Sequence, residues 1–405
     1  MIPVDDAVAT IVGTITRLPS ELVHLDEALG RVLADDLVAV LPVPRFDNSA
    51  MDGYAVHADV TAAASANMPV VLDVIGESAA GDGAAMVVAR KEAARIFTGA
   101  PIPKGCDAVV MQENVTRDGG SVRITTPVAR NENVRTLGED IAVGAVLLSS
   151  GALMSAGEVA ITATQGRNLL PVVRAPRVAI VVTGNELVEL DRLVTAAATT
   201  IPNSNAVMLA AQVREAGGVP IRAPIVRDEP DAVADALFRA AAIADIVVTS
   251  GGVSVGDHDH VASVVAKHGS VTFHKVRMRP GKPVVFGSFA GKPFFGLPGN
   301  PVSSFVAFEL FVRPALRTMQ GADDVMRPTA PAALTAGVSP ARDRPSYMRV
   351  QLRRDGTQLY ATPSARQGAG DLTSLVAAHG LAIIEAGGTQ VATGTIVNCL
   401  LLRTC

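Results

Sequence analysis

From about residue 176 onward, apolar runs typical of strands alternate with segments typical of helices, and this alternation constrains the fold more than any other feature. The run at 178–182 is continuous, apolar and β-branched, as expected for a strand buried on both faces. Repeated strand–helix units with short loops predict a parallel sheet covered by helices. The other elements predicted in this region are strands at 221–226 and 245–249, a hairpin at 284–289 and 292–295, and helices at 205–216, 230–242 and 301–316.

Local signals refine the ends of these elements. Ser204 or Asn205 is expected to cap the first helix of the region, and Asp228 is expected to cap the next one, which Pro230 suits at its first turn. Pro224 has no N–H for a sheet ladder, so the strand that contains it is expected at an edge of the sheet.

The rest of the 405-residue chain leaves room for further domains. Leu22, Leu25 and Leu29 fall at helical spacing, which predicts a helix in the N-terminal segment. Short strands are expected at 69–75, 94–98, 108–111 and 121–124, a short helix at 157–165, and a small β barrel or sandwich after residue 328. The predicted fold class is multidomain α/β plus β, with an elongated N-terminal domain at 1–45 and 146–175, an inserted all-β domain at 46–145, an α/β domain at 176–326 and a C-terminal β domain at 327–405.

Charge, cysteine content and hydropathy exclude several classes of protein. With 35 basic and 39 acidic side chains the net charge is −4, which argues against a nucleic-acid partner. The longest uncharged stretch, 193–213, is interrupted by Pro202, and the N-terminus is acidic, so neither a membrane span nor a secretory signal is predicted. Cys106, Cys399 and Cys405 are too few and too scattered for a disulfide framework or a zinc site, which favours a cytoplasmic location.

Polar residues cluster where the strands of the predicted sheet end, and ligands of open parallel sheets bind beyond the carboxyl ends of the strands. Glu186 follows the first predicted strand, Asp228 the second, and a glycine-rich loop that ends near Asp259 follows the third. The glycines of that loop allow backbone N–H groups to approach an anion, and its serines add hydroxyl donors: Ser250, Gly251, Gly252, Ser254 and Gly256. Any one such loop is more often a plain turn or helix cap, but three at one edge favour a ligand site.

A second glycine-rich segment, at 296–304, joins a strand to a helix N-terminus, which offers free N–H groups and a favourable dipole to a phosphate. Lys275, Arg279 and Lys282 lie between the two glycine-rich segments in the sequence. Such loops with nearby cations and carboxylates imply a phosphorylated ligand bridged by Mg²⁺, which prefers carboxylate and phosphate oxygens. Two histidines of the first loop do not favour zinc, because no third His or Cys stands at ligand spacing.

Three motifs outside this region, at 47–55, 98–100 and 138–140, are compatible with ordinary turns when each is considered alone. Together with five motifs of the α/β region they form a specific combination. The eight occur in the order DNSAMDGYA, TGA, GED, TGNEL, NSN, SGGVSVG, PGKP and GLPGNP. In this combination the chain resembles the molybdopterin molybdenumtransferase family, the MoeA-type enzymes that correspond to the E-domain of gephyrin, over almost its whole length.

The resemblance implies a fold of four parts that correspond to the domains above, with a molybdopterin-binding α/β domain and a C-terminal β-barrel. It also implies a homodimer whose active site lies between the α/β domain of one subunit and the β insertion of the other. The implied enzyme takes adenylylated molybdopterin and molybdate, cleaves the pyrophosphate with Mg²⁺, releases AMP and leaves molybdenum on the dithiolene. A molybdopterin adenylyltransferase and recipient molybdoenzymes are the partners that this reaction would allow.

By motif position, the resemblance implies two sets of site residues. The catalytic carboxylates would be Asp52, Asp140, Glu186, Asp228 and Asp259, of which Glu186, Asp228 and Asp259 would bind the metal. The substrate-binding residues would be Thr98, Asn203, Ser204, Asn205, Ser250, Gly251, Gly252, Ser254, Gly256, Lys275, Arg279, Lys282, Pro298, Gly299, Asn300, Pro301 and Ser303. The chain departs from the family pattern where Asn185, His260 and Arg279 stand in place of the more usual Asp, Tyr and Lys.

Other functions stay open at this point. An enzyme that adenylylates molybdopterin with ATP would resemble residues 176–320 alone, and a pyridine-nucleotide deamidase built on a similar module would lack the β insertion. A non-catalytic molybdopterin carrier or a scaffold would bind the pterin without releasing AMP. AMP release that depends on molybdate distinguishes the insertase from these alternatives.

Overall fold

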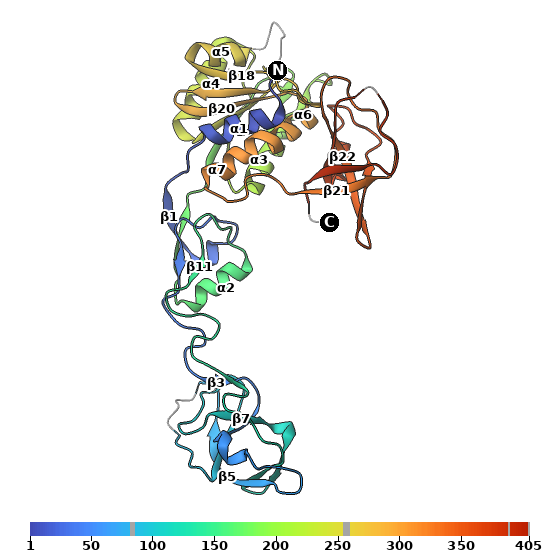
Figure 1. Ribbon diagram of the computed structural model, residues 1–405. Helices are drawn as coiled ribbons and strands as arrows, with labels where there is room; N and C mark the ends of the chain where they lie inside the picture. Colours follow the sequence, from blue (N-terminus) through green and yellow to red (C-terminus); the bar gives the residue numbers. More distant parts are fainter. Residues whose placement is uncertain (82–85, 254–259, 388, 404–405) are drawn as a thin grey trace. The chain divides into compact units, whose positions relative to one another are not determined.

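The computed structural model describes residues 1–81, 86–253, 260–387 and 389–403 (Figure 1). The chain forms two compact units. The first unit comprises residues 1–35, 151–155 and 169–405, and the second comprises residues 36–150 and 156–168. No helix within the described residues is long and apolar enough to cross a membrane.

The first unit is built around a six-stranded sheet with the strand order β16-β13-β17-β20-β19-β18. The strands are β13 (Arg177–Val182), β16 (Val219–Arg222), β17 (Ile246–Ser250), β18 (Gly269–Phe273), β19 (Val285–Phe289) and β20 (Lys292–Leu297). β16, β13, β17 and β20 lie next to one another in this order and are parallel. β19 pairs with both β20 and β18 in the antiparallel direction. The predicted α/β fold class and the predicted hairpin are confirmed.

Helices bury both faces of this sheet. They are α1 (Val4–Thr14), α3 (Ser204–Glu215), α4 (Pro230–Ile243), α5 (His260–His268), α6 (Pro301–Ala307) and α7 (Arg313–Met319). Val178, Ile180 and Val182 of β13 pack into one core with residues of α1, α3, α6 and α7. Ala179 and Val181 pack into a second core with α4 and α5, so alternate residues of this apolar strand are buried on opposite faces.

The helix caps differ from the prediction. The N-cap of α3 is Asn203, whose side chain accepts a hydrogen bond from Ala206 N, and neither Ser204 nor Asn205 caps this helix. The N-cap of α4 is Glu229, without a side-chain cap, and Pro230 opens the helix as expected. Each helix begins one residue away from the predicted cap: Ser204 and Asn205 lie inside α3, and Asp228 lies one residue before the N-cap of α4.

The strand predicted at 221–226 is shorter and earlier, at Val219–Arg222. It lies at the edge of the sheet, as Pro224 indicated. Ala223 N still donates to Ile180 O, but the ladder stops before the proline, and Val226 pairs with Thr183 only in an isolated bridge.

The helix predicted from the spacing of Leu22, Leu25 and Leu29 is wrong. Residues Ser20–His24 form strand β1, which pairs with β12 (Leu169–Val173). Leu22 is 67% exposed and Leu29 is 69% exposed, so the apolar spacing does not mark a buried helical face. The helix of this segment, α1, lies earlier in the chain, because pairing across the chain decides the conformation of Ser20–His24.

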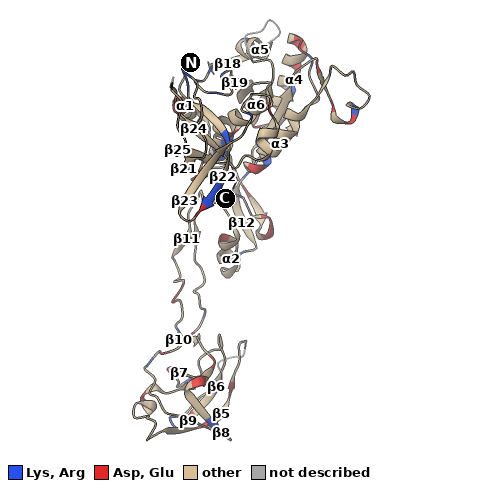
Figure 2. Cartoon of the chain, turned by 90° about the vertical axis from the view of Figure 1, so that its right-hand side faces the viewer, with Lys and Arg blue, Asp and Glu red and all other residues tan. Residues whose placement is uncertain are grey.

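The C-terminal region closes into a five-stranded barrel with the order β21-β23-β22-β24-β25, which confirms the predicted barrel. Its strands are β21 (Thr329–Leu334), β22 (Ser346–Asp355), β23 (Gln358–Pro363), β24 (Gly380–Ile384) and β25 (Ile396–Leu401). Basic residues stand out on β22 in Figure 2, and they are Arg349, Arg353 and Arg354. The barrel contacts the α/β part of the unit where Arg279 N donates to Pro345 O and Tyr347 N donates to Arg279 O.

The second unit contains a six-stranded sheet with the order β7-β4-β6-β5-β9-β8. Its strands are β4 (Gly53–Val56), β5 (Val70–Ser78), β6 (Glu92–Ile96), β7 (Ala108–Met111), β8 (Val115–Asp118) and β9 (Ser121–Ile124), and its helix is α2 (Ala156–Thr164). The chain enters and leaves this sheet along paired segments. β2 (Leu37–Val38) pairs with β11 (Val146–Leu148), Val43 pairs with Ile141, and β3 (Asn48–Ser49) pairs with β10 (Val134–Arg135).

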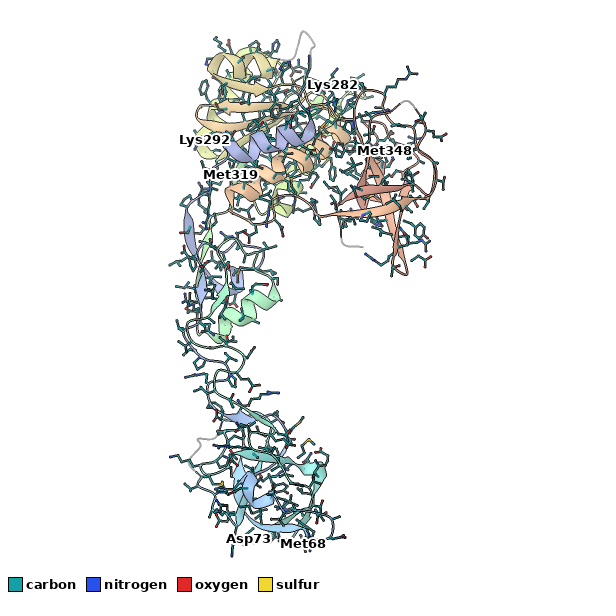
Figure 3. The ribbon with its side chains drawn as sticks, in the orientation of Figure 1. Met68, Asp73, Lys282, Lys292, Met319 and Met348 are labelled. Carbon is teal, nitrogen blue, oxygen red and sulfur yellow. The ribbon has the colours of Figure 1, made fainter. Side chains whose placement is uncertain are left out.

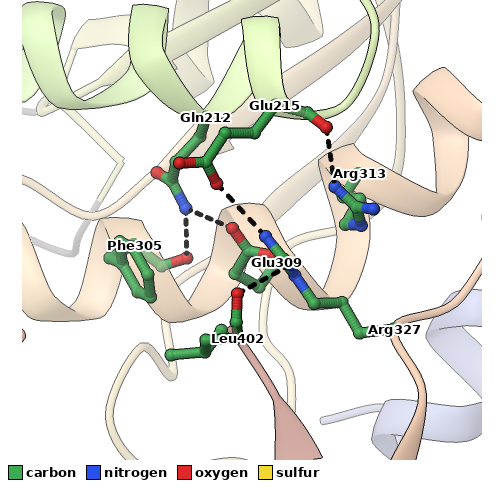
Figure 4. A network of polar contacts seen from close by, with 7 residues as sticks. All are labelled: Gln212, Glu215, Phe305, Glu309, Arg313, Arg327 and Leu402. Atoms are coloured by element: carbon green, nitrogen blue, oxygen red, sulfur yellow. Dashed lines mark hydrogen bonds and ion pairs between the residues drawn. The ribbon is translucent and has the colours of Figure 1, made fainter. Parts of the chain in front are cut away.

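A buried polar network joins the barrel to the helices of the first unit (Figure 4). Its centre is Glu309, 1% exposed, in the π-helical turn η5 (Phe308–Val312). Arg327 Nε donates to Glu309 Oε2 at 2.7 Å, and Gln212 Nε2 donates to Glu309 Oε1 at 2.8 Å. Arg327, just before β21, also donates to Leu402 O, just after β25, at 3.0 Å, so it joins the two ends of the barrel to η5. Beside the network, burial lowers the pKa of Arg313 to about 10.

Replacing Glu309 with alanine is expected to lower the free energy of unfolding by about 3–5 kcal/mol, because the largely buried guanidinium of Arg327 then loses its buried carboxylate and keeps only the longer pair with the exposed Glu215. Denaturant unfolding of the full chain measures this change. The matched control is Arg353→Ala, whose pair with Asp355 is exposed, with an expected change of about 0–1 kcal/mol. Equal losses in the two variants would contradict a structural role for the buried network.

Candidate functional site

A cavity of about 700 Å³ lies at the carboxyl ends of the parallel strands. It is lined by residues from six segments of the chain, at 182–187, 201–205, 250–253, 283, 298–301 and 370–372, and by Asp228 in the turn that precedes α4. The predicted site residues among them are Glu186, Asn203, Ser204, Asn205, Asp228, Ser250, Gly251, Gly252, Pro298, Gly299, Asn300 and Pro301. The structure therefore brings together most of the residues that the sequence singled out in the α/β domain. Asp259, Ser254 and Gly256 lie outside the described residues.

Asn205 connects three of these loops. Its Nδ2 donates to Ser250 Oγ at 2.9 Å and to Gly299 O at 2.7 Å. Ser250 Oγ in turn donates to Pro298 O at 3.1 Å. Asn205 thus lies at the start of α3 without capping it, and the Ser250 hydroxyl is already engaged within the protein. Both side chains hold the loops in place around the cavity.

The glycines of the first loop are required by its backbone. Gly251 has φ +95° and Gly252 has φ +67°, which side chains rarely adopt, and a Cβ at Gly251 would lie 2.7 Å from Thr183 O. The N–H of Gly251 donates to Leu297 O at 3.1 Å, so this group does not face a ligand as the glycine pattern suggested. The close approach of Gly251 to β13 packs the loop against the end of the sheet.

Two carboxylates border the cavity. Glu186 is exposed, and Asp228 is half-buried. Asn185 N donates to Asp228 Oδ2 at 3.2 Å, and Asp228 N donates to Asn185 Oδ1 at 3.3 Å. The backbone N–H of Asn185 therefore orients the Asp228 carboxylate, whereas the Asn185 side chain, at a position where the resembled family often has Asp, accepts from the Asp228 backbone.

The donor set of the cavity fits Mg²⁺. Mg²⁺ usually takes one or two carboxylates and completes its shell with water and substrate phosphates. Glu186 and Asp228 supply two carboxylates beside loops suited to phosphate. Within the described residues no group of three His, Cys, Asp or Glu side chains could hold a metal ion, so the carboxylates there require phosphate or water oxygens to complete a shell.

None of the three predicted cations lines this cavity, and one of them, Arg279, lines another. Arg279 lines a second cavity of about 290 Å³ together with Ser346, Arg349 and Gln367 of the C-terminal domain. Lys282 lies on the loop before β19, where Figure 3 labels it, and is exposed. Lys275 is half-buried. The segment 279–283 borders both cavities, because Pro283 lines the first and Arg279 lines the second.

Arg349 was missed by the sequence analysis. It is 1% exposed, and its Nε donates to Ser374 Oγ at 3.0 Å while its Nη2 donates to Gly368 O at 3.0 Å. Burial lowers the pKa of Arg349 to about 10. This value is still well above 7, so the guanidinium is charged at neutral pH. Two guanidiniums, Arg279 and Arg349, thus border one small cavity. The signal available in the sequence was a charged residue in the middle of a strand pattern, between Met348 and Val350.

Two further residues line the first cavity, and one predicted site residue lies in the core instead. Gly370 and Leu372, from the loop after β23, also line the first cavity and were not predicted. Val302 N donates to Ala369 O at 3.0 Å, which ties this loop to α6. Ser303 is buried and lines neither of the two cavities.

In the second unit, Asp52 is held by Thr98. Thr98 N and Thr98 Oγ1 both donate to Asp52 Oδ1 at 2.8 Å. These two bonds, the backbone bond first, hold the pKa of the Asp52 carboxyl below its usual range. Asp140, also in this unit, is exposed, and its backbone N–H donates to Val43 O at 3.0 Å.

Arg95 supports the Asp52 loop and was not predicted. Its guanidinium lies 5.2 Å from the centre of the Tyr54 ring and 4.9 Å from that of the Phe97 ring. It also donates to Gly53 O at 3.1 Å and to Gln112 Oε1 at 2.6 Å. The residue after Asp52 is thereby anchored to β6.

Comparison with protein-family models gives three matches along the chain. Residues 2–166 match the MoeA N-terminal region (domain I and II), residues 179–318 match a probable molybdopterin binding domain, and residues 331–402 match the MoeA C-terminal region (domain IV).

Similar proteins extend over nearly the full length. A molybdopterin molybdenumtransferase 2 of Mycobacterium tuberculosis (strain H37Rv) is 38% identical over 384 residues, which cover 92% of this chain and 93% of the relative. A molybdopterin molybdenumtransferase of Staphylococcus aureus (strain MSSA476) is 33% identical over 401 residues, which cover 99% of this chain and 95% of the relative. The crystal structure of the molybdopterin biosynthesis moeA protein from Pyrococcus horikoshii OT3 aligns with a TM-score of 0.87 at 31% identity, covering 99% of this chain and all of that one.

The Thr98→Val variant is expected to raise the pKa of Asp52, because the hydroxyl donor is lost, but to leave it below its usual range, because Thr98 N still donates. The stability that this carboxylate contributes is present above its unfolded pKa and is lost as the pH falls through the folded pKa, so in the variant the contribution is smaller and its loss is complete at a higher pH. A carbon-detected NMR titration of the Asp52 carboxyl measures the change. Thr116→Val, on exposed β8, is the control, and an unchanged Asp52 pKa in Thr98→Val would contradict the hydrogen-bond assignment.

Proposed function

The chain belongs to the MoeA family of molybdopterin molybdenumtransferases, which act in molybdenum cofactor biosynthesis, and we propose that it is a molybdenum insertase. In this proposal it transfers molybdenum from molybdate to the dithiolene of adenylylated molybdopterin and releases AMP. The observation that carries the proposal is the 700 Å³ cavity, where two carboxylates meet two glycine-rich loops at the end of a parallel sheet. The full-length relatives do not favour an adenylyltransferase or a passive carrier.

The carboxylates and the loops have separate tasks in this proposal. Glu186 and Asp228, with Asp259, would hold Mg²⁺, and the hydrogen bonds between Asn185 and Asp228 orient one of these carboxylates in advance. When bound, Mg²⁺ neutralises charge on the phosphates and polarises the phosphoryl oxygens. The loops at 250–253 and 298–301, fixed by Asn205, accommodate the pterin phosphate.

Molybdate, a compact dianion, is a substrate that suits the second cavity. Arg279 and the buried Arg349 supply two fixed positive charges there, and Lys275 and Lys282 add charge along the same segment of chain. Water adds to the phosphoanhydride bond and separates AMP from molybdopterin. The two dithiolene sulfurs bind molybdenum, and their protons leave with one molybdate oxygen as water.

The residues of the second unit enter through a homodimer in this proposal. The partner subunit's Asp52, Thr98 and Asp140 would complete the site, which accounts for a carboxylate held at low pKa by Thr98 outside the α/β domain. Molybdopterin adenylyltransferase would supply the substrate, and molybdoenzymes would receive the product.

The purified protein is expected to release AMP from adenylylated molybdopterin only with both molybdate and Mg²⁺, and chelation of the metal should stop the release. Asp228→Asn is expected to reduce the rate by about 100-fold or more, because a charged metal ligand is lost. The matched control is Asp231→Asn, an exposed carboxylate in the first turn of α4 that does not line the cavity. Tight binding without AMP release would identify a carrier, and consumption of ATP an adenylyltransferase.

The dimeric site predicts complementation between inactive variants. Mixed dimers of Asp52→Asn and Asp228→Asn have one site that carries both changes and one that carries neither, so random exchange should restore about a quarter of the wild-type rate. A mixture of Glu186→Gln and Asp228→Asn, both in the α/β domain, is the control and should restore none. Equal rates in the two mixtures would exclude a site shared between subunits.

A further inference from the structure

Six side-chain polar atoms are buried without a hydrogen-bond partner within the described residues. They are Thr183 Oγ1, Gln212 Oε1, Thr249 Oγ1, Ser304 Oγ, Arg313 Nε and Arg344 Nε. Of these residues, Thr183 alone lines the 700 Å³ cavity. Buried polar groups are nearly always paired, so an unpaired hydroxyl at a ligand cavity calls for a physical explanation.

The backbone holds Thr183 in a fixed place under the glycine-rich loop. Thr183 follows β13 and is 5% exposed, its N–H donates to Ser250 O at 3.3 Å, and it forms a bridge with Val226. A Cβ would lie 3.2 Å from Thr183 Oγ1 if it were built on Gly251, and 3.1 Å if it were built on Gly252. On the loop side, the two glycines therefore pack against the buried hydroxyl with backbone atoms alone, and no side chain of theirs lies between it and the cavity.

We propose that the Thr183 hydroxyl is a substrate-binding group that donates to a phosphate oxygen of the pterin substrate. The proposal rests on the proposed function and adds a residue to its site. The sequence predicts Ser250 as a hydroxyl donor to the ligand, but its Oγ already donates to Pro298 O at 3.1 Å. Thr183 lines the same cavity, and its hydroxyl has no hydrogen-bond partner. An anionic acceptor forms a stronger hydrogen bond with a buried hydroxyl than a neutral acceptor does.

An unpaired hydroxyl has a distinctive mutational signature. Removing it without changing the side-chain shape should not destabilise the free protein, since no bond is lost, and should weaken only the complex. A hydroxyl that supports the fold would give the opposite result. Thr249 is the matched control, because it is a buried and unpaired threonine on the adjacent strand β17 but does not line the cavity.

The experiment compares the full-length wild type with Thr183→Val, Thr183→Ser and Thr249→Val. Thermal unfolding is measured without ligand, and the dissociation constant of molybdopterin, which carries the terminal phosphate, is measured by fluorescence titration. Thr183→Val should melt at or above the wild-type temperature and bind molybdopterin about tenfold more weakly. Thr183→Ser should bind nearly as the wild type does, and Thr249→Val should match the wild type in affinity.

The outcomes separate the inference from the proposed function. Wild-type affinity in Thr183→Val, or a lower melting temperature of that variant without ligand, would overturn the role of Thr183 while leaving the insertase proposal intact. An equal loss of affinity in Thr249→Val would also overturn it, because the effect would not belong to the cavity. A wild-type protein that does not bind molybdopterin would overturn both proposals.

Discussion

The candidate site depends on the hydrogen bonds of one buried amide. Asn205 joins the start of α3 to the end of β17 through Ser250 and to the loop before α6 through Gly299. These three segments come from distant parts of the sequence, and each of them contributes to the wall of the same cavity. A side chain with two N–H donors on one nitrogen can hold two loops at once, which a serine or an aspartate at this position could not do.

The charges of the site are separated in space. Glu186 and Asp228 border one cavity, whereas Arg279 and Arg349 border another, and the segment 279–283 contributes to both. Opposite charges packed together would neutralise each other in an ion pair and leave little potential for a substrate. Kept in separate cavities, the carboxylates remain suited to a cation, and the guanidiniums to an anion.

The sequence predicted those parts of the fold and site that depend on local pattern. The apolar run of β13 and its neighbours indicated a parallel sheet, and the position of Asp228 and Glu186 after the strands indicated the edge at which they meet. The N-terminal helix was misplaced because pairing with β12, not leucine spacing, decides the conformation of Ser20–His24. Arg349 and Arg95 were not predicted because their contacts with Gly368 and with Gly53 and Tyr54 join segments that are separated in the sequence.

The second unit is entered and left along one ribbon of paired chain. Val38 lies opposite Val146, Val43 opposite Ile141, and Ser49 opposite Val134. The segment that enters the sheet and the segment that leaves it are therefore neighbours at each of these three positions. The two ends at which the chain would be rejoined without the β insertion therefore already lie side by side, where Val38 pairs with Val146.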